Sequence, residues 1–129
     1  MSQTRKRMRA RMPDFVILKH IADSTHYDVM FEKDGALKTF TLRSEPNGPD
    51  EYEAEQRFDH PVKFLDFEGD LPRAPGRVER WDRGVYKALE WRECLIELDC
   101  RGEKWNDRIT LKRITPEKWL LKKHPQEKR

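Results

Sequence analysis

The feature that most constrains the fold is a period-two alternation of apolar and polar residues, which starts at Asp14 and recurs along the chain. The clearest stretch is His26–Glu32, where Tyr27, Val29 and Phe31 alternate with a second set that is mostly polar. Successive side chains of a β-strand point to opposite faces, so this spacing predicts a half-buried strand. No long helical periodicity competes with the pattern, and we therefore expect a chain built from strands.

Turn-forming residues separate the predicted strands at intervals of about ten residues. Asp34-Gly35 is a strong signal for a two-residue hairpin turn, which would join His26–Glu32 to Ala36–Leu42. The other strand candidates are Phe15–His20, Val62–Phe67, Arg77–Trp81, Val85–Leu89, Cys94–Cys100, Arg108–Ile114 and Trp119–Lys123. Many short strands at this spacing predict a mainly β fold, an antiparallel barrel or sandwich with at most short flanking helices.

Two segments are predicted to interrupt the strands. Residues 43–56 contain three Pro and Gly residues and a run of acidic residues, which predict a loop with room for one helical turn at Asp50–Gln56. Arg83-Gly84 predicts a turn between the strand candidates on either side of it.

The length of 129 residues fits one domain, which we place at residues 13–125. Only 36% of the residues are hydrophobic and 40% are charged, and the longest uncharged apolar run is Phe15–Leu18. That run is far too short for a membrane-spanning helix, and no apolar segment follows the basic start as a secretory signal requires. We therefore expect a soluble cytoplasmic protein with no membrane partner. Cys94 and Cys100 form no metal-binding or redox motif and are expected to be reduced.

Charge is distributed unevenly along the chain. Residues 1–44 and 71–129 carry an excess of Lys and Arg, whereas residues 45–70 are strongly acidic. Residues 1–12 predict a disordered basic arm that could lie along phosphates, and residues 126–129 predict a tail. Basic ends around an acidic middle are typical of a polyanion-binding protein with one acidic zone, although a highly charged surface without a specific partner gives the same pattern.

His26 and Asp28 are the first candidates for a metal site. Two residues apart on one strand, they would point to the same face with Cα atoms about 7 Å apart. His20 ends the preceding strand candidate, and a short link could fold it over the pair. Two imidazoles and a carboxylate leave coordination positions open and suit Mn²⁺, Fe²⁺ or Zn²⁺. The alternative is that these are surface histidines near a hairpin.

His60 is the candidate for proton transfer. It precedes a proline in Asp59-His60-Pro61 and could orient or protonate a phosphate oxygen, because histidine titrates near neutral pH. The alternative is an ordinary turn histidine. A different chemistry also remains open: His26 and Asp28 with His60 or His124 as third ligand would match the two-histidine, one-carboxylate pattern of iron oxygenases.

Taken in order, the motifs of this chain resemble the 3′-phosphoesterase module of bacterial and archaeal DNA ligase D. The matching blocks are Phe15–His20 followed by His26-Tyr27-Asp28, Asp34–Lys38, Asp59-His60-Pro61, Asp66–Pro72, Gly76-Arg77-Val78, Trp81–Tyr86 and Trp119–His124. They run from residue 15 to residue 124, nearly the whole chain. The resemblance is therefore far more specific than any single His-x-Asp pair.

The resemblance implies a compact β-barrel that binds Mn²⁺, with Zn²⁺ or another divalent transition metal as alternatives. By position, His20, His26 and Asp28 match the metal ligands of the family, and His60 matches the histidine that contacts the scissile phosphate. The implied activity is healing of nucleic-acid 3′ ends in DNA break repair: a terminal 3′-ribonucleotide is removed, then a 3′-phosphate, and a 3′-OH remains. We expect a nucleoid-associated monomer that acts with a separate DNA ligase or end-joining proteins.

Three departures affect the predicted phosphate site. Met30 and Tyr52 stand where the family has arginines, and Phe64 stands where it has a tyrosine. Missing cations weaken the stabilisation of a transferring phosphoryl group. Arg57 and Arg43 lie close enough in sequence to substitute for them. Arg77, together with Arg73 and Arg80, could also reach the groove. The alternative function is a weak or inactive module that binds nucleic acid or repair proteins on the same scaffold.

Overall fold

The computed structural model describes residues 11–125. Most of the predicted basic arm, and the tail at residues 126–129, lie outside the described residues. The elements are β1 (Asp14–Ile21), β2 (Thr25–Lys33), β3 (Ala36–Leu42), β4 (Glu51–His60), the 3₁₀-helix η1 (Val62–Leu65), β5 (Gly69–Asp70), β6 (Arg77–Trp91), β7 (Leu95–Gly102), β8 (Arg108–Arg113) and β9 (Lys118–His124). No helix within residues 11–125 has the length and apolar character needed to cross a membrane.

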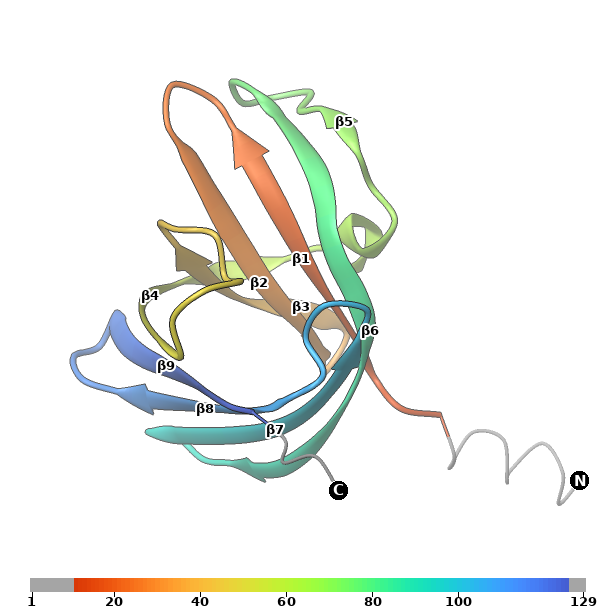
Figure 1. Ribbon diagram of the computed structural model, residues 1–129. Coiled ribbons are helices and arrows are strands. Elements are labelled where there is room, and N and C mark those ends of the chain that lie inside the picture. The colour runs from red at the N-terminus through yellow and green to blue at the C-terminus, as the bar shows by residue number, and fades with distance from the viewer. Residues whose placement is uncertain (1–10, 126–129) are drawn as a thin grey trace, which may run out of the picture.

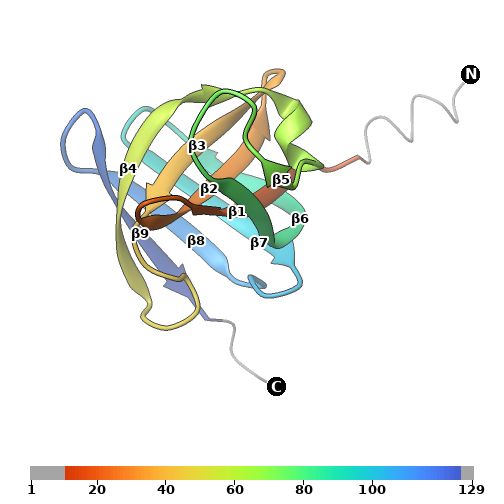
Figure 2. The same ribbon diagram turned by 90° about the horizontal axis from the view of Figure 1, so that it is seen from above.

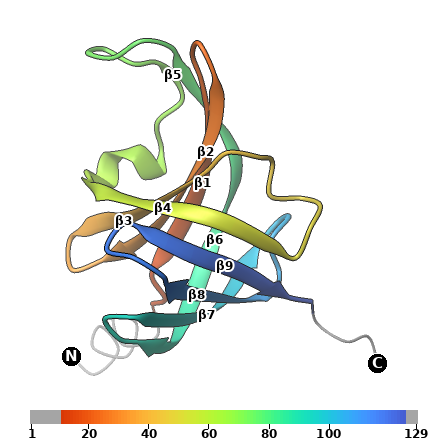
Figure 3. The ribbon, with the colours of Figure 1, turned by 90° about the vertical axis from the view of Figure 1, so that its left-hand side faces the viewer.

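The strands form one closed antiparallel barrel, which confirms the predicted fold class. Their order is β1-β2-β3-β4-β9-β8-β7-β6, and β6 pairs with β1 to close the ring, while the short β5 adds to β6 outside it. Figure 1 shows the strands arranged as a ring, and the view from above in Figure 2 shows β2 and β3 crossing in front of β7 and β8. Strands β4, β9, β8 and β7 follow one another across one side of the molecule (Figure 3).

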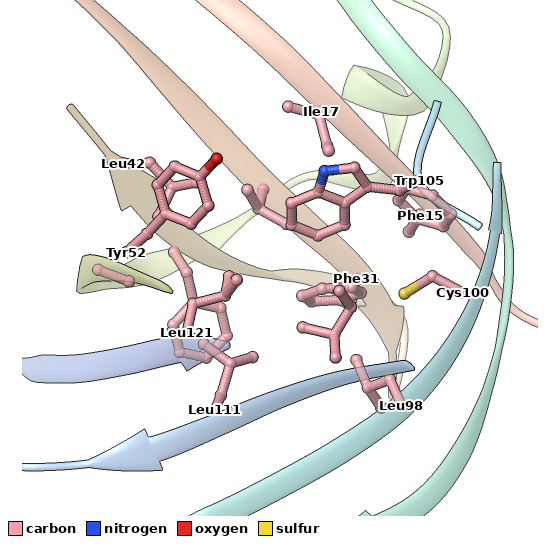
Figure 4. Close-up of a cluster of buried hydrophobic side chains, with 14 of the residues drawn as sticks. Phe15, Ile17, Phe31, Leu42, Tyr52, Leu98, Cys100, Trp105, Leu111 and Leu121 are labelled. Carbon is pink, nitrogen blue, oxygen red and sulfur yellow. The ribbon is translucent and has the colours of Figure 1, made fainter. Parts of the chain in front are cut away.

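Large apolar side chains fill the inside of the barrel (Figure 4). The alternating residues of β2 behave as predicted, because Tyr27, Val29 and Phe31 all join this core. Trp105, from the connection between β7 and β8, is fully enclosed, and its indole Nε1 donates to the carbonyl of Pro46 at 3.0 Å. Such a bond satisfies the polar atom of an otherwise apolar side chain, so the tryptophan can fill the barrel without an unpaired donor.

A buried carboxylate organises the connection between β7 and β8. Asp82 is only 3% exposed and accepts four backbone N–H bonds, from Arg83, Glu103, Lys104 and Trp105, at 2.8 to 3.1 Å. Backbone donors that lack a strand partner are thereby satisfied inside the protein. The same residue explains why Gly102 tolerates no side chain: a Cβ there would lie 2.5 Å from the Asp82 carboxylate.

The turn predicted at Arg83-Gly84 is wrong, because β6 runs unbroken through it. Gly84 is opposite Phe15 of β1 and Gly102 of β7, at the point where β6 exchanges one partner strand for the other. A Cβ at Gly84 would come within 2.1 Å of the Arg101 carbonyl oxygen. The glycine therefore allows close approach of two backbones, a role that a local sequence pattern cannot distinguish from a turn.

Two further expectations are corrected between β3 and β6. The loop predicted at residues 43–56 is confirmed as far as residue 50, but Glu51 begins strand β4, in which the buried Tyr52 and Ala54 alternate with exposed acidic residues. The helical turn predicted at Asp50–Gln56 is therefore wrong. The strand predicted at Val62–Phe67 is instead η1, followed by a bend at Asp66. Acidic residues disfavour strands locally, but pairing of β4 with both β3 and β9 overrides that preference.

A second apolar cluster lies outside the barrel, beneath η1. Val16, Leu18, Met30, Leu37, Leu65 and Val78 form it, with Phe64, Phe67 and Leu71 packed against them. Arg83 ties the segment down, since its guanidinium binds Asp66, donates to the Leu65 carbonyl at 2.8 Å and pairs with Asp14. The outer faces of β1 and β2 are therefore partly covered, and only part of them remains open for a site.

We predict that Asp82→Ala lowers the free energy of unfolding by about 3 kcal/mol or more, because four buried N–H groups lose their acceptor. Urea denaturation followed by tryptophan fluorescence measures the change. Asp70→Ala, at an exposed acidic residue of β5, serves as the matched control and should leave stability nearly unchanged. Equal effects of the two substitutions would contradict the role of Asp82.

Both cysteines are free, as predicted, but their reactivities should differ. Cys94 is exposed, whereas Cys100 is buried in the core, and burial raises the pKa of its thiol far above the ordinary value. Because the thiolate is the reactive form, we expect one thiol of the native protein to react quickly with Ellman's reagent at mildly alkaline pH. Denatured protein should react at both. Two fast thiols in the native state would contradict the packing around Cys100.

Candidate functional site

Three side chains predicted to converge lie together near the β1–β2 turn, where β5 and the start of β6 also lie (Figure 1). His20 and His26 are cross-strand partners, and Asp28 follows two residues along β2 on the same face. One ligand atom from each of the three lies within 4.8 Å of the other two, and all three side chains are half-buried. Among residues 11–125, no other such group of three histidine, cysteine or acidic side chains occurs.

Neighbouring polar groups hold each ligand atom in position. His20 Nε2 is 3.1 Å from the carbonyl oxygen of Pro75, which can only accept, so this nitrogen carries a proton and Nδ1 keeps its lone pair. The Thr41 hydroxyl donates to Asp28 Oδ1 at 2.7 Å and leaves Oδ2 facing His26. Metal-binding histidines and carboxylates commonly have such outer partners, which orient them and select the tautomer.

The spacing of the donor atoms fits a bound transition-metal ion. His20 Nδ1 lies 3.0 Å from His26 Nε2, which lies 3.5 Å from Asp28 Oδ2. Two ligands held at about 2.1 Å from one ion, at octahedral to tetrahedral angles, would be roughly 3.0–3.4 Å apart. Mixed nitrogen and oxygen donors suit Mn²⁺, Fe²⁺ or Zn²⁺ better than Ca²⁺ or Mg²⁺.

Asp28 is held in its ionised form. Burial alone would raise the pKa of its carboxyl, but hydrogen bonds from His26 and Thr41 and the positive charges of His26 and His60 outweigh burial. The net pKa of Asp28 therefore lies below its ordinary value. An anionic carboxylate beside the His26 imidazole is ready to bind a cation without first losing a proton.

His60 ends β4 on the same side of the barrel. Its Nδ1 is 3.1 Å from the carbonyl oxygen of Phe58 and 3.0 Å from the hydroxyl of Thr39, which itself donates to the Leu37 carbonyl. Both contacts are therefore acceptors for Nδ1, which must carry the proton. In the neutral ring, Nε2 then has the free lone pair and is the atom available to a substrate.

A β-bulge brings His60 and Arg57 to one face. Thr39 is opposite Arg57 and Leu37 is opposite His60, so β4 uses three steps where β3 uses two. Without the extra residue, side chains three apart would point to opposite faces. Arg57 is exposed, lies beside Thr39 and makes only a loose pair with Glu55 at 3.9 Å. Its guanidinium thus remains available near His60.

The other predicted arginines are placed differently. Arg43 follows β3 and lines a groove of about 670 Å³ together with Thr41 and Glu55, so it borders the site. Arg77 pairs with Glu79 at 2.9 Å. It is next to Val78, the cross-strand neighbour of His20, so alternation points Arg77 to the opposite face. The structure therefore brings Arg57 and Arg43 to the site but not Arg77.

The three residues that differ from the family pattern, Met30, Tyr52 and Phe64, carry no positive charge. Met30 is buried in the cluster beneath η1, and Tyr52 is buried in the barrel core, with its hydroxyl accepting from the backbone of Gly48. Phe64 packs edge-on against His60, with ring centres 5.8 Å apart. Met30 and Phe64 thus lie in the apolar cluster on the outer face, whereas Tyr52 belongs to the barrel interior.

Sequence reasoning missed the two threonines of β3. Thr39 and Thr41 alternate on the strand that faces β2, and each hydroxyl binds a candidate site residue. Once β3 is paired with β2, the spacing of the two threonines predicts that both hydroxyls lie on the face that carries Asp28. The Pro75 carbonyl had no such signal, because 55 residues separate it from His20. His124, considered as an alternative ligand, instead bonds to Thr110 on the outer face of β8 and β9.

Comparison with known proteins identifies relatives of this chain. A family model described as the DNA ligase D 3′-phosphoesterase domain matches residues 18–113, a range that contains all three candidate ligands and His60. The multifunctional non-homologous end joining protein LigD of Mycolicibacterium smegmatis is 30% identical over 135 residues, covering 88% of this chain and 17% of that protein. The Pseudomonas aeruginosa protein of the same name is 37% identical over 84 residues, covering 59% and 10%. The chain thus spans less than a fifth of each.

We predict that Thr41→Val weakens Mn²⁺ binding about tenfold or more, because Asp28 loses the hydroxyl that orients its carboxylate. Isothermal titration with Mn²⁺ measures the affinity. Thr110→Val is the matched control, since it removes a similarly buried hydroxyl that bonds to His124. Equal affinities of the Thr41 and Thr110 variants, or no Mn²⁺ binding by the unaltered protein, would contradict the site.

Proposed function

Because the chain belongs to the family of DNA ligase D 3′-phosphoesterase domains, we propose that it is a metal-dependent phosphoesterase that heals nucleic-acid 3′ ends. It removes a 3′-phosphate, or a terminal 3′-ribonucleotide, and leaves the 3′-OH that ligation needs. The convergence of His20, His26 and Asp28, each held by its neighbours, is the observation that carries the proposal.

In this proposal His20 Nδ1, His26 Nε2 and Asp28 Oδ2 hold a divalent cation, with Mn²⁺ the first candidate. A bound ion of this kind supplies charge stabilisation to a phosphate oxygen and lowers the pKa of a bound water. The remaining work falls to the protein. Pro75 and Thr41 keep the ligands aligned, and the Thr41 hydroxyl donates to Asp28 Oδ1 while Oδ2 faces the cation site.

His60 acts on the phosphate through Nε2. Since Nδ1 is committed to Phe58 and Thr39, a protonated ring has one free N–H, which can donate to a phosphoryl oxygen or to the departing 3′-oxygen. When the 3′-oxygen leaves phosphorus it takes this proton and becomes the 3′-OH. The water that attacks phosphorus supplies the oxygen of the released phosphate, and the proton that this water loses stays on that phosphate.

Arg57 and Arg43 neutralise the charge of the phosphate and the neighbouring backbone. Arg57 shares a face with His60, and Arg43 borders the groove next to Thr41. Guanidinium groups bind phosphate oxygens in a forked geometry, so even one arginine can orient the substrate. We propose that these residues replace the cations absent at Met30 and Tyr52.

The relatives carry names that refer to non-homologous end joining. We propose that this chain acts on DNA ends in the same kind of repair, before a ligase joins them. A second candidate function is a binding module that holds ends without processing them. Met30 and Tyr52 favour this alternative, because two buried side chains without positive charge stand where the family has arginines. Fewer cations are then available to stabilise the phosphate during the proposed reaction.

We predict that the protein converts primer–templates ending in 3′-phosphate, or in one 3′-ribonucleotide, to 3′-OH products in the presence of Mn²⁺. Chelation with EDTA and Asp28→Ala should each abolish conversion, and His60→Ala should slow it about a hundredfold or more. Gel analysis of end-labelled strands measures the rates, with Mg²⁺ and Zn²⁺ tested in parallel.

His124→Ala is the control, because this histidine lies on β9 away from the ligand cluster and should leave the rate unchanged. Absence of conversion by folded, Mn²⁺-loaded protein would overturn the enzyme proposal and leave the binding module.

A further inference from the structure

An exposed aromatic ring stands directly beside His60. Phe58 is 83% exposed, more than any other large hydrophobic residue between residues 11 and 125. Its ring stacks on the His60 imidazole, with centres 5.5 Å apart and planes inclined by only 12°. The His60 imidazole therefore lies parallel to part of the ring, and most of the ring remains open to solvent.

Packing within the barrel does not explain this phenylalanine. It belongs to neither apolar cluster, and it sits at the bulge of β4, where the ladder with β3 is interrupted. A large apolar ring held in water forgoes the stabilisation that burial brings, and residues so placed often meet a ligand. Flat stacking on one side prepares the other side for a second planar group.

Charges around Phe58 favour nucleic acid as the source of that planar group. Arg57 immediately precedes it with an exposed guanidinium, and Lys63 lies 6.0 Å from the centre of the Phe64 ring, which itself touches His60. The one adjacent acid, Asp59, is paired with Lys38 at 2.9 Å. Exposed aromatic rings flanked by cations are how proteins bind unpaired nucleotides, with bases stacked and backbone phosphates neutralised.

We propose that Phe58 binds the substrate by stacking the base of the 3′-terminal nucleotide on its free face. This rests on the proposed function and adds to it a contact that the metal ligands and His60 do not provide. Because the ring is already stacked on His60, a base placed on it brings its phosphate towards His60 Nε2. Stacking needs a base but accepts any of the four, since each has a π-face. The enzyme should therefore favour ends that carry a terminal base over ends that lack one.

A double comparison tests this directly. Wild-type protein and Phe58→Ala are each titrated with two labelled primer–templates that differ only in a terminal nucleotide with its base or an abasic residue. Wild-type protein should bind the base-containing end about tenfold more tightly, and Phe58→Ala should lose that preference. Phe58→Trp, which keeps a stacking ring, should retain it. Leu89→Ala is the control, because it removes another exposed apolar side chain, 46% exposed, on the part of β6 that pairs with β7.

The outcomes separate this inference from the proposed function. A base preference that depends on Phe58 supports stacking even if no 3′-phosphate is hydrolysed, a result that would count against the enzyme alone. Equal binding of both ends by wild-type protein, or an unchanged preference in Phe58→Ala, overturns the inference. The proposed function can still stand in that case, because the hydrolysis of 3′-phosphate ends is measured separately. If Phe58→Ala instead alters only the oligomeric state in sedimentation, the ring covers a protein surface and the inference is likewise overturned.

Discussion

Closure of the barrel between β1 and β6 is the constraint on which the rest of the structure depends. Pairing runs from Asp14 opposite Val85 to Ile21 opposite Arg77, so that β1 has a neighbour on each side along its whole length. His20 consequently meets His26 on one side and lies opposite Val78 on the other, and the Pro75 carbonyl that selects its tautomer comes from the chain leading into β6. Without the pairing of β1 with β6, the sheet would keep the β1–β2 pair, but His20 would lose the Pro75 carbonyl that orients its ring.

The barrel wall has an apolar inner face, which holds the strands together, and a partly covered outer face, which carries the site. Its inner face is filled mainly by aromatic and aliphatic side chains, which hold the strands together and leave polar residues of β2 and β3 on the outer face. On the outer face, the cluster beneath η1 covers part of β1 and β2 and stops short of Asp28 and the histidines. The site is therefore half-buried. It is dry enough to strengthen the bonds from Thr41 and His26 to Asp28, yet open enough for a phosphate to approach.

Much of this could be predicted from local pattern. Alternation around Tyr27, Val29 and Phe31 identified β2 and its buried face, and the same period placed His26 and Asp28 together on the other face. The ordered motifs from Phe15 to His124 led to the correct family. Errors arose where long-range contacts decide the outcome. Tyr52 and Ala54 belong to a strand because β3 and β9 pair with it, and Gly84 lies within β6 because two strands approach its backbone.

Short antiparallel strands, the residues that point to the core and the three donors near the first turn could all be predicted from the order of residues along the chain. These follow from spacing along one strand or across one hairpin, which are local properties of the chain. Only the tertiary structure decided that Thr41 binds Asp28, that Arg57 and His60 share a face, and that Phe58 stacks on His60. The physical reason is that strand order, a bulge and ring stacking depend on which distant segments become neighbours, and no short stretch of sequence contains that information.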